Sequence, residues 1–330
     1  MATLEVRDLE VSFGSARILR RVSFDLVAGE TLGIVGESGC GKSMTAFAVM
    51  GMLPGNGRVT AGSIKLDGRE LVGLKERALQ QVRGGDIALV MQDPFTSLNP
   101  MMRIGHQIAE ALMLHQDLKG KAAWNRAVEM LDKVGVPAPE SSARKFPHQM
   151  SGGQRQRVVI AMAFACRPKV LIADEPTTAL DVTLQAQILR LIREMQEQEG
   201  TAVMMISHDI GAIASISSRI GVFYAGRIVE SGPAEAVLRR GGMPYTRALL
   251  NALPQPGRKQ LEAISGQPPD LARLPQGCAF SPRCPLRFEK CAEEPELLPI
   301  EEGHSAACWR AEEVAKMAEG KPLGREAAES

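Results

Sequence analysis

The 330-residue sequence lacks a strong excess of charge of either sign. Its 39 Lys and Arg residues nearly balance 38 Asp and Glu residues, giving a formal net charge of +1. Proteins that attract nucleic acid or anionic lipid by general electrostatics usually carry a strong basic excess. We therefore expect no nucleic-acid partner, and any membrane partner should be a protein.

Long apolar segments are also missing. The longest apolar run, 158–166, ends at Arg167 and Pro168. It is much shorter than the roughly 20 residues that cross a bilayer. The first residues include the acidic Glu5 and no apolar run, unlike a secretory signal peptide. We expect a cytosolic chain without a membrane span.

The six cysteines do not indicate a disulfide framework, because cytosolic thiols are kept reduced. Cys40 and Cys166 are isolated. The other four crowd the last sixth of the chain with the spacing C-x5-C-x6-C-x16-C, and they are Cys278, Cys284, Cys291 and Cys308. Four thiolates can hold a zinc ion or an iron–sulfur cluster. Unliganded structural thiols are an alternative, and the lack of a C-x2-C pair makes a standard zinc ribbon less natural.

The chain is long enough for one large α/β domain with an appendage. Strands are expected over 4–9, 18–26, 31–35, 170–173 and 201–206, and helices over 42–52, 152–166 and 183–198. Residues 94–147 predict a helical insertion, a subdomain spanning about 95–150. Strand alternating with helix implies a parallel core sheet. Ala225-Gly226 predicts a two-residue hairpin.

A change of composition suggests a domain boundary. Residues 254–277 are rich in Pro and Gly, as linkers are. We expect a large α/β domain over 1–253 and an extension over 254–330.

Residues 36–43, Gly-Glu-Ser-Gly-Cys-Gly-Lys-Ser, fit the phosphate-binding loop G-x-x-x-x-G-K-S/T. Its glycines allow backbone N–H groups to face phosphate oxygens, Lys42 reaches the β- and γ-phosphates, and Ser43 ligates Mg²⁺. The loop lies between a predicted strand and a helix, as this motif requires. Cys40 occupies a variable position, where a small filler is expected.

Two acids end the apolar segment 170–175. In an open parallel sheet ligands bind at the carboxyl ends of the strands, so Asp174 should lie beside Mg²⁺ and Glu175 beside an attacking water. We assign Asp174 to the metal and Glu175 as the catalytic base.

Residues 150–157, Met-Ser-Gly-Gly-Gln-Arg-Gln-Arg, stand just before a predicted helix and resemble the signature of ATP-binding-cassette (ABC) ATPases, with Met150 where Leu is usual. Ser151 can cap the helix, whose first amides and dipole offer an anion site. In the family this segment closes over ATP held by a partner subunit. The resemblance thus implies that Ser151, Gly152, Gly153 and Gln154 act in trans.

Further residues match this family in order along the chain. Gln92 matches the glutamine that contacts Mg²⁺ and the attacking water. Asp181, in the segment 179–181, matches a loop that crosses the dimer interface. His208 matches the histidine that senses the γ-phosphate, and Phe13 matches the aromatic that stacks on adenine.

The resemblance implies catalytic roles for Glu175, His208, Gln92 and Lys42, with Ser43, Gln92 and Asp174 around Mg²⁺. The residues expected to bind ATP in cis are Phe13, Gly36, Glu37, Ser38, Gly39, Cys40, Gly41, Lys42, Ser43, Gln92 and Asp174. The resemblance also implies a P-loop NTPase (RecA-like) α/β core with an N-terminal antiparallel β subdomain, a helical signature subdomain and a small cysteine-containing C-terminal extension.

The C-terminal residues indicate a subfamily within the ABC ATPases. Residues 277–285, with 96–100 and 244–250, resemble ATPase subunits of dipeptide and oligopeptide importers. Some members of that subfamily carry a 4Fe-4S cluster in the extension, which the four cysteines would bind here. His304 is expected to be a surface residue rather than a fifth ligand. Regulatory redox or metal sensing by the cysteines remains open.

The implied function is ATP hydrolysis that drives uptake of di- or oligopeptides, or a related solute such as a nickel chelate, across the bacterial inner membrane. The implied partners are a second ABC ATPase, more naturally in a heterodimer than a homodimer, two permease subunits and an extracytoplasmic substrate-binding protein. The chain would lie peripherally on the cytoplasmic face. The competing hypothesis is an ABC ATPase acting on nucleic acid or the ribosome. Such proteins typically hold two cassettes or a long coiled-coil insertion, and this chain has one cassette.

Overall fold

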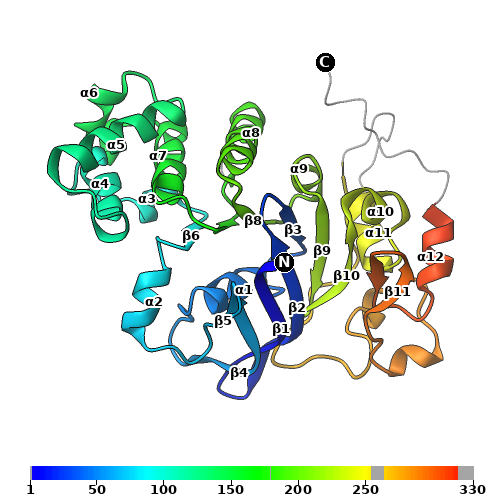
Figure 1. Ribbon diagram of the computed structural model, residues 1–330. Helices are drawn as coiled ribbons and strands as arrows, with labels where there is room; N and C mark the ends of the chain where they lie inside the picture. The colour runs from blue at the N-terminus through cyan, green and yellow to red at the C-terminus, as the bar shows by residue number, and fades with distance from the viewer. Residues whose placement is uncertain (1, 179, 254–263, 319–330) are drawn as a thin grey trace.

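The computed structural model of the chain describes residues 2–178, 180–253 and 264–318 (Figure 1). A four-stranded antiparallel sheet, in the order β2-β1-β4-β5, forms from the first part of the chain. Its strands are β1 (Ala2–Phe13), β2 (Ala16–Val27), β4 (Gly57–Leu66) and β5 (Arg69–Glu70). The N-terminal antiparallel β subdomain is thus confirmed, with two more strands than the sequence indicated.

The second sheet has eight strands in the order β11-β12-β10-β9-β3-β8-β7-β6. Strands β9, β3, β8, β7 and β6 run parallel, and β10, β12 and β11 continue the sheet in antiparallel fashion. The parallel strands are β3 (Thr31–Val35), β6 (Ile87–Val90), β7 (Val170–Asp174), β8 (Ala202–Ser207) and β9 (Arg219–Tyr224). Every residue of β3, β7 and β8 is buried, because layers cover both faces, and this explains their continuous apolar sequences.

Helices α3–α7 form a lobe beside the parallel sheet, seen at the left in Figure 1. They are α3 (Pro94–Ser97), α4 (Ile104–His115), α5 (Gly120–Lys133), α6 (Pro139–Ala143) and α7 (Gly152–Ala165), with a 3₁₀ turn at Pro147–Gln149. The apolar side chains of Ile104, Ile108 and Leu112 recur at helical spacing on α4, and all are buried. Their burial explains the helical pattern that the sequence showed here.

The helices outside this lobe and before the C-terminal extension lie around the two sheets. They are α1 (Lys42–Val49), α2 (Glu76–Val82), α8 (Val182–Glu199), α9 (Ile210–Ala214), α10 (Ala234–Arg240) and α11 (Pro244–Asn251). The predicted hairpin joins β9 to β10 (Arg227–Pro233). Ala225 and Gly226 have φ of 49° and 77°, as a two-residue turn with two left-handed positions requires.

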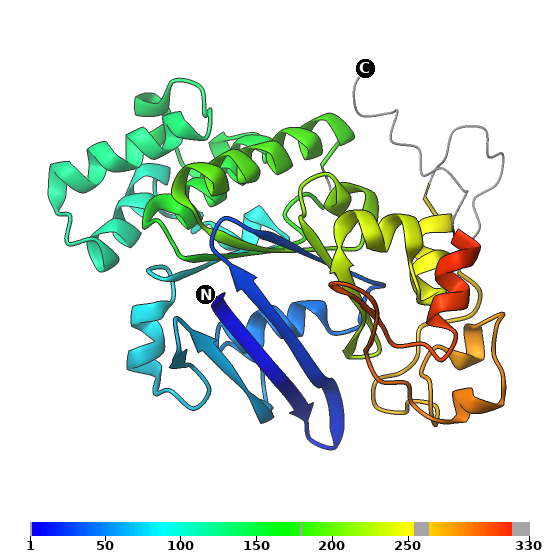
Figure 2. The same ribbon diagram turned by 45° about the vertical axis from the view of Figure 1, so that its right-hand side comes forward.

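The described part of the C-terminal extension packs onto the main sheet. Its elements are β11 (Leu298–Glu301), β12 (His304–Ala306), α12 (Ala311–Ala318) and 3₁₀ turns at Ser281–Arg283 and Glu289–Ala292. Strand β12 pairs with β10, and α12 lies against α10 (Figure 2). Part of the predicted boundary, residues 254–263, lies outside the described residues.

The described helices include none that is both long enough and apolar enough to cross a membrane.

Candidate nucleotide-binding site

The phosphate-binding loop connects the end of β3 to the start of α1. A Cβ at Gly36 would lie 2.3 Å from the carbonyl oxygen of Phe223, so the loop can pass this strand only with glycine there. Gly41 caps α1 with φ of 112°. The buried Lys42 folds across the loop, and its Nζ donates to the carbonyl oxygens of Gly36 at 2.7 Å and Glu37 at 2.9 Å. The predicted strand, loop and helix are therefore present, with the lysine amine inside the loop.

Asp174 ends β7 and carries an unsatisfied oxygen. Its side chain is buried, and within the described chain Oδ1 has no hydrogen-bond partner. Burial raises the pKa of Asp174, while a hydrogen bond from Ser43 opposes the rise. An unpaired buried carboxylate oxygen is costly, and carboxylate and hydroxyl oxygens are ligands that Mg²⁺ takes. Ser43 and Asp174 thus fit a magnesium ion.

Three side chains converge on the carboxylate of Glu175. Gln92 Nε2 donates to Oε2 at 3.1 Å, Thr178 Oγ1 donates to Oε2 at 2.9 Å, and His208 Nδ1 lies 3.1 Å from Oε1. Gln92, Glu175 and His208 follow the adjacent strands β6, β7 and β8, so the carboxyl edge of the sheet brings them together. Sequence reasoning missed Thr178.

Two physical features set Glu175 apart. Burial alone would raise its pKa, but hydrogen bonds from His208 and Thr178 outweigh burial, and the pKa is lowered. The carboxylate is therefore ionised at neutral pH. Its backbone φ is 48°, in the left-handed region that costs a non-glycine residue energy. A strained residue in a cluster of polar side chains is typical of a functional site.

The predicted signature segment begins α7 in the helical lobe. Ser151 is the N-cap of this helix, where its Oγ accepts from the amide of Gln154 at 3.3 Å, and its own amide donates to Gln154 Oε1 at 3.1 Å. Gly153 packs closely, because a Cβ there would lie 2.8 Å from Leu184. A Cβ at Gly152 would meet open space. Ser151 is exposed and residues 152–154 are partly exposed, so an external anion could reach the start of α7.

Two more predicted residues are at least partly accessible to solvent. Asp181 caps α8, where its Oδ1 accepts from the amide of Leu184 at 2.9 Å. Position 179, in the same predicted loop, lies outside the described residues. Phe13 ends β1, with its ring so close to Gly57 that a Cβ there would lie 2.5 Å from it. Phe13 is only partly buried, so part of its ring remains available.

Comparison with known proteins identifies the family. Residues 19–178 match the family described as ABC transporter, and 229–291 match "Oligopeptide/dipeptide transporter, C-terminal region". The oligopeptide transport ATP-binding protein OppD of Salmonella typhimurium is 49% identical over 313 residues, which cover 93% of each chain. This chain belongs to the ABC transporter family of ATP-binding proteins.

Further relatives agree with that assignment. The dipeptide transport ATP-binding protein DppD of Escherichia coli is 44% identical over 315 residues, covering 93% of this ABC ATPase and 96% of the relative. Among solved structures, the dimeric post-hydrolysis state of the ATP-binding cassette MJ0796, bound to ADP and Pi, matches with a TM-score of 0.62 and 26% identity. It covers 70% of this chain and 98% of that chain. The predicted cassette fold is therefore confirmed.

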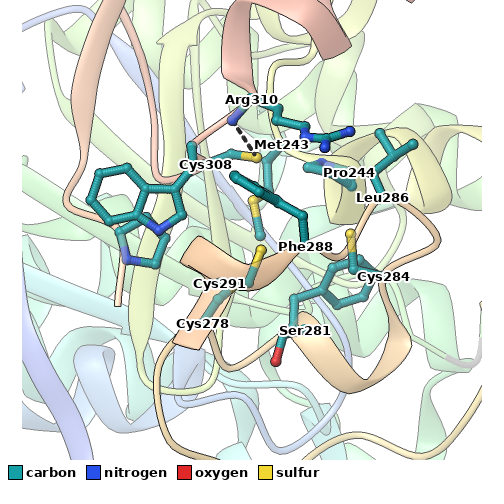
Figure 3. A pocket seen from close by; sticks show the side chains of 13 residues that line it. Met243, Pro244, Cys278, Ser281, Cys284, Leu286, Phe288, Cys291, Cys308 and Arg310 are labelled. Carbon is teal, nitrogen blue, oxygen red and sulfur yellow. Dashed lines mark hydrogen bonds between the residues drawn. The ribbon is translucent and has the colours of Figure 1, made fainter. Parts of the chain in front are cut away.

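The extension of this ABC ATPase brings its four cysteines around one small pocket of about 20 Å³, which Phe288 and Arg310 also line (Figure 3). Burial raises the pKa of Cys278, Cys284 and Cys308, the last to about 11. These thiols are therefore protonated at neutral pH in the protein alone, whereas metal ligands must be thiolates.

The fit of the pocket to a metal is poor as it stands. In the part of the chain that the structure describes, no group of three or more His, Cys, Asp or Glu side chains is placed to hold a metal ion. The pocket volume suits about one water molecule. The structure thus gathers the four predicted cysteines but does not support an iron–sulfur cluster or a zinc ion among them.

The expectation for His304 is wrong. The side chain is fully buried on β12, with Nε2 2.7 Å from Glu230 Oε1 and Nδ1 3.1 Å from Glu301 Oε1. Glu230 also accepts from the amides of Gly242 and Met243. The antiparallel pairing of β12 with β10 places the histidine over the acid, and this pairing left no signal in the local sequence.

Two residues that contact the phosphate-binding loop were not predicted. The hydroxyl of Tyr245, on α11, accepts from the amide of Glu37 at 2.8 Å. Arg283, in the extension, forms an ion pair with the Glu37 carboxylate. Segment 244–250 stood out only as a family resemblance, which gave no hint of this contact.

Proposed function

We propose that this ABC ATPase hydrolyses ATP with Glu175 as the general base, to drive import of di- or oligopeptides. The observation that carries the proposal is the convergence of Gln92, Thr178 and His208 on the Glu175 carboxylate. Phosphoryl transfer is catalysed mainly by positioning and electrostatic stabilisation, and these contacts supply a fixed, ionised base beside the phosphate-binding loop.

Each part of the site has a distinct task. The loop amides bind phosphate oxygens, and Lys42 exchanges the carbonyls of Gly36 and Glu37 for the β- and γ-phosphates. Ser43, Asp174 and Gln92 would hold Mg²⁺, which would supply positive charge to offset that of the phosphates. Glu175 orients a water and accepts its proton, and His208 restrains that carboxylate.

The active enzyme is a dimer with composite sites. The exposed start of α7 offers Ser151, Gly152, Gly153 and Gln154 to a nucleotide on a partner subunit, and Asp181 lies on the neighbouring edge of α8. The dimeric, ADP-bound state of the structural relative supports this arrangement. The part of the site within one chain should therefore bind ATP but hydrolyse it poorly.

The cargo and partners are inferred from the relatives, which are named as oligopeptide and dipeptide transport ATP-binding proteins. We infer two permease subunits, an extracytoplasmic substrate-binding protein and a heterodimer with a second ABC ATPase. The chain would bind the cytoplasmic face of the inner membrane peripherally. A related solute such as a nickel chelate is the alternative cargo.

We also propose two organisational features. Residues 1–253 form the nucleotide-binding domain, with the helical subdomain at about 95–150, and 254–330 form the importer-type extension, a division based on the Pro- and Gly-rich composition of 254–277. The four extension cysteines are proposed as ligands of a 4Fe-4S cluster on the family resemblance alone, because the pocket they line is too small for a cluster as it stands. Iron and acid-labile sulfide analysis of protein purified without oxygen tests this, and the absence of both leaves structural thiols.

Transport can be tested in cells. A strain whose chain carries Lys42→Ala should lose energy-dependent accumulation of radiolabelled di- and oligopeptides, because the phosphate-binding loop loses its only lysine. A matched Lys65→Ala strain should take up peptide normally, since Lys65 is exposed on β4. Normal peptide uptake with Lys42→Ala would contradict peptide import, and a selective loss of nickel-chelate uptake would identify the alternative cargo.

A further inference from the structure

Arg283 links the C-terminal extension to the phosphate-binding loop. Its side chain is only 5% exposed, and its guanidinium pairs with both carboxylate oxygens of Glu37, Nη1 with Oε2 at 2.6 Å and Nη2 with Oε1 at 2.8 Å. Two parallel hydrogen bonds of this kind are stronger and more directional than a single contact. The two residues are 246 positions apart in sequence.

The rest of the guanidinium is fixed as well. Nε donates to the carbonyl oxygen of Ser265 at 2.8 Å, and Nη1 reaches the hydroxyl of Tyr224 at 3.3 Å. Phe280, three residues before Arg283, packs edge-on against Tyr224 with ring centroids 5.3 Å apart. Arg283 is therefore held from the extension side and from β9, and it presents a preorganised fork to Glu37.

Glu37 is restrained at three points. Its carboxylate pairs with Arg283, its amide donates to Tyr245, and its carbonyl accepts from Lys42. Restraints on this residue fix the first turn of the loop whose amides must face phosphate. Ordering the loop before binding removes a conformational cost from the binding step.

The ion pair also offsets the negative charge of Glu37. Glu37 places a negative charge in a loop that receives the polyanionic phosphates of a nucleotide, and like charges in a partly buried site repel strongly. Arg283 neutralises that charge where the carboxylate is only 20% exposed. Hydrogen bonding to Glu37 raises the pKa of Arg283, which therefore stays charged.

We propose that Arg283 is a positioning residue of the ATPase: it holds and neutralises Glu37 so that the phosphate-binding loop accepts nucleotide. The inference rests on the proposed function of that loop as the nucleotide site. It assigns the extension a direct part in nucleotide affinity. Cys284 follows Arg283 in sequence and lines the four-cysteine pocket. A structural change in that pocket would therefore occur next to the Arg283–Glu37 ion pair.

The test measures the Kd for ADP, without hydrolysis, on purified full-length variants. Arg283→Gln should raise the Kd about tenfold, because the charge of Glu37 is left unpaired in the loop that receives the phosphates, and Arg283→Lys about threefold, because charge remains but the fork is lost. Arg287→Gln is the matched control, since Arg287 is an exposed arginine of the same segment, and its Kd should equal that of wild type. Circular dichroism and thermal unfolding confirm folding.

The double variant distinguishes pairing from general damage. In an E37Q background, R283Q should change the Kd less than twofold, because no unpaired carboxylate remains. A Kd for R283Q within twofold of wild type would overturn the proposal. So would an equal loss on adding R283Q to E37Q, since Arg283 would then act without Glu37. Wild-type protein that binds no ADP would instead contradict the proposed nucleotide site itself.

Discussion

His208 Nδ1 lies 3.1 Å from Glu175 Oε1, so the residue that follows β8 touches the residue that follows β7. The two side chains have different exposure: that of His208 is 59% exposed and that of Glu175 is 17% exposed. The histidine thus stands at the open side of the site while the carboxylate stays partly enclosed. This places His208 between solvent and the proposed base.

Replacing His208 with Ala should slow ATP turnover by about 10²-fold, because Glu175 loses one of the contacts that orient it. The Kd for ATP should change little, since the loop and Lys42 are untouched. Steady-state turnover and equilibrium binding on the same preparation measure the two effects. Turnover within threefold of wild type would show that His208 is dispensable.

Ser151 has two separable roles, a helix cap and a proposed contact to the partner's nucleotide. Ser151→Ala should cost about 1 kcal/mol of stability, the usual cost of losing such a cap. Ser151→Asp keeps a capping oxygen but adds negative charge at the anion site. We expect it to unfold near the wild-type temperature yet lose most ATPase activity in the assembled transporter. Full activity of this variant would contradict the role in trans.

Asp174 is expected to lower the stability of the metal-free protein and to bind Mg²⁺. Asp174→Asn removes a buried charge whose Oδ1 lacks a partner within the described residues, so the metal-free protein should unfold about 2–4 °C higher, for a gain of about 1 kcal/mol. Mg²⁺-dependent turnover should be lost. Differential scanning calorimetry without Mg²⁺, followed by ATPase assays with it, tests both effects. A lower melting temperature with retained turnover would contradict the magnesium assignment.

The buried His304 should make stability depend on pH. Burial alone lowers the pKa of His304, but hydrogen bonds and charge from Glu230 and Glu301 outweigh it, so the pKa is raised above its ordinary 6.5. A raised folded pKa stabilises the protein fully below pH 6.5 and progressively less as pH rises through the folded value. Thermal unfolding should therefore occur at a higher temperature at pH 6 than at pH 8.5.

A variant separates His304 from the other titrating groups. His304→Gln keeps hydrogen-bond capacity but cannot titrate, so the difference between pH 6 and pH 8.5 should shrink. It should also cost about 3 kcal/mol at pH 6, because Glu230 loses its charged partner. An unchanged pH difference in this variant would assign the effect to other groups.

The sequence predicted the parts of the site that depend on local spacing. Gly36 passes so close to Phe223 that the loop between β3 and α1 requires glycine there. The glycine pattern of this loop can therefore be recognised from one sequence alone. Asp174 and Glu175 could be predicted because they lie at the end of an apolar strand, and ligands of an open parallel sheet bind at the carboxyl ends of its strands. These features lie within one strand, one turn or one helix start.

Contacts between distant segments left no comparable pattern. The pairing of Arg283 with Glu37 depends on how the extension folds back over the loop, and the burial of His304 depends on β12 joining β10. Each of these residues looks like an ordinary surface residue in its own segment. The contact between the extension and the phosphate-binding loop is seen only in the tertiary fold.

Glu175 is the proposed general base for ATP hydrolysis by this chain. The most direct measurement compares ATP turnover by wild type, Glu175→Gln and the matched Glu194→Gln, whose glutamate is exposed on α8, all assembled with their partner subunits. We predict that Glu175→Gln binds ATP normally but turns over about 10²- to 10⁴-fold more slowly, as expected for loss of a general base, and that Glu194→Gln matches wild type. Turnover by Glu175→Gln near the wild-type rate would contradict this assignment.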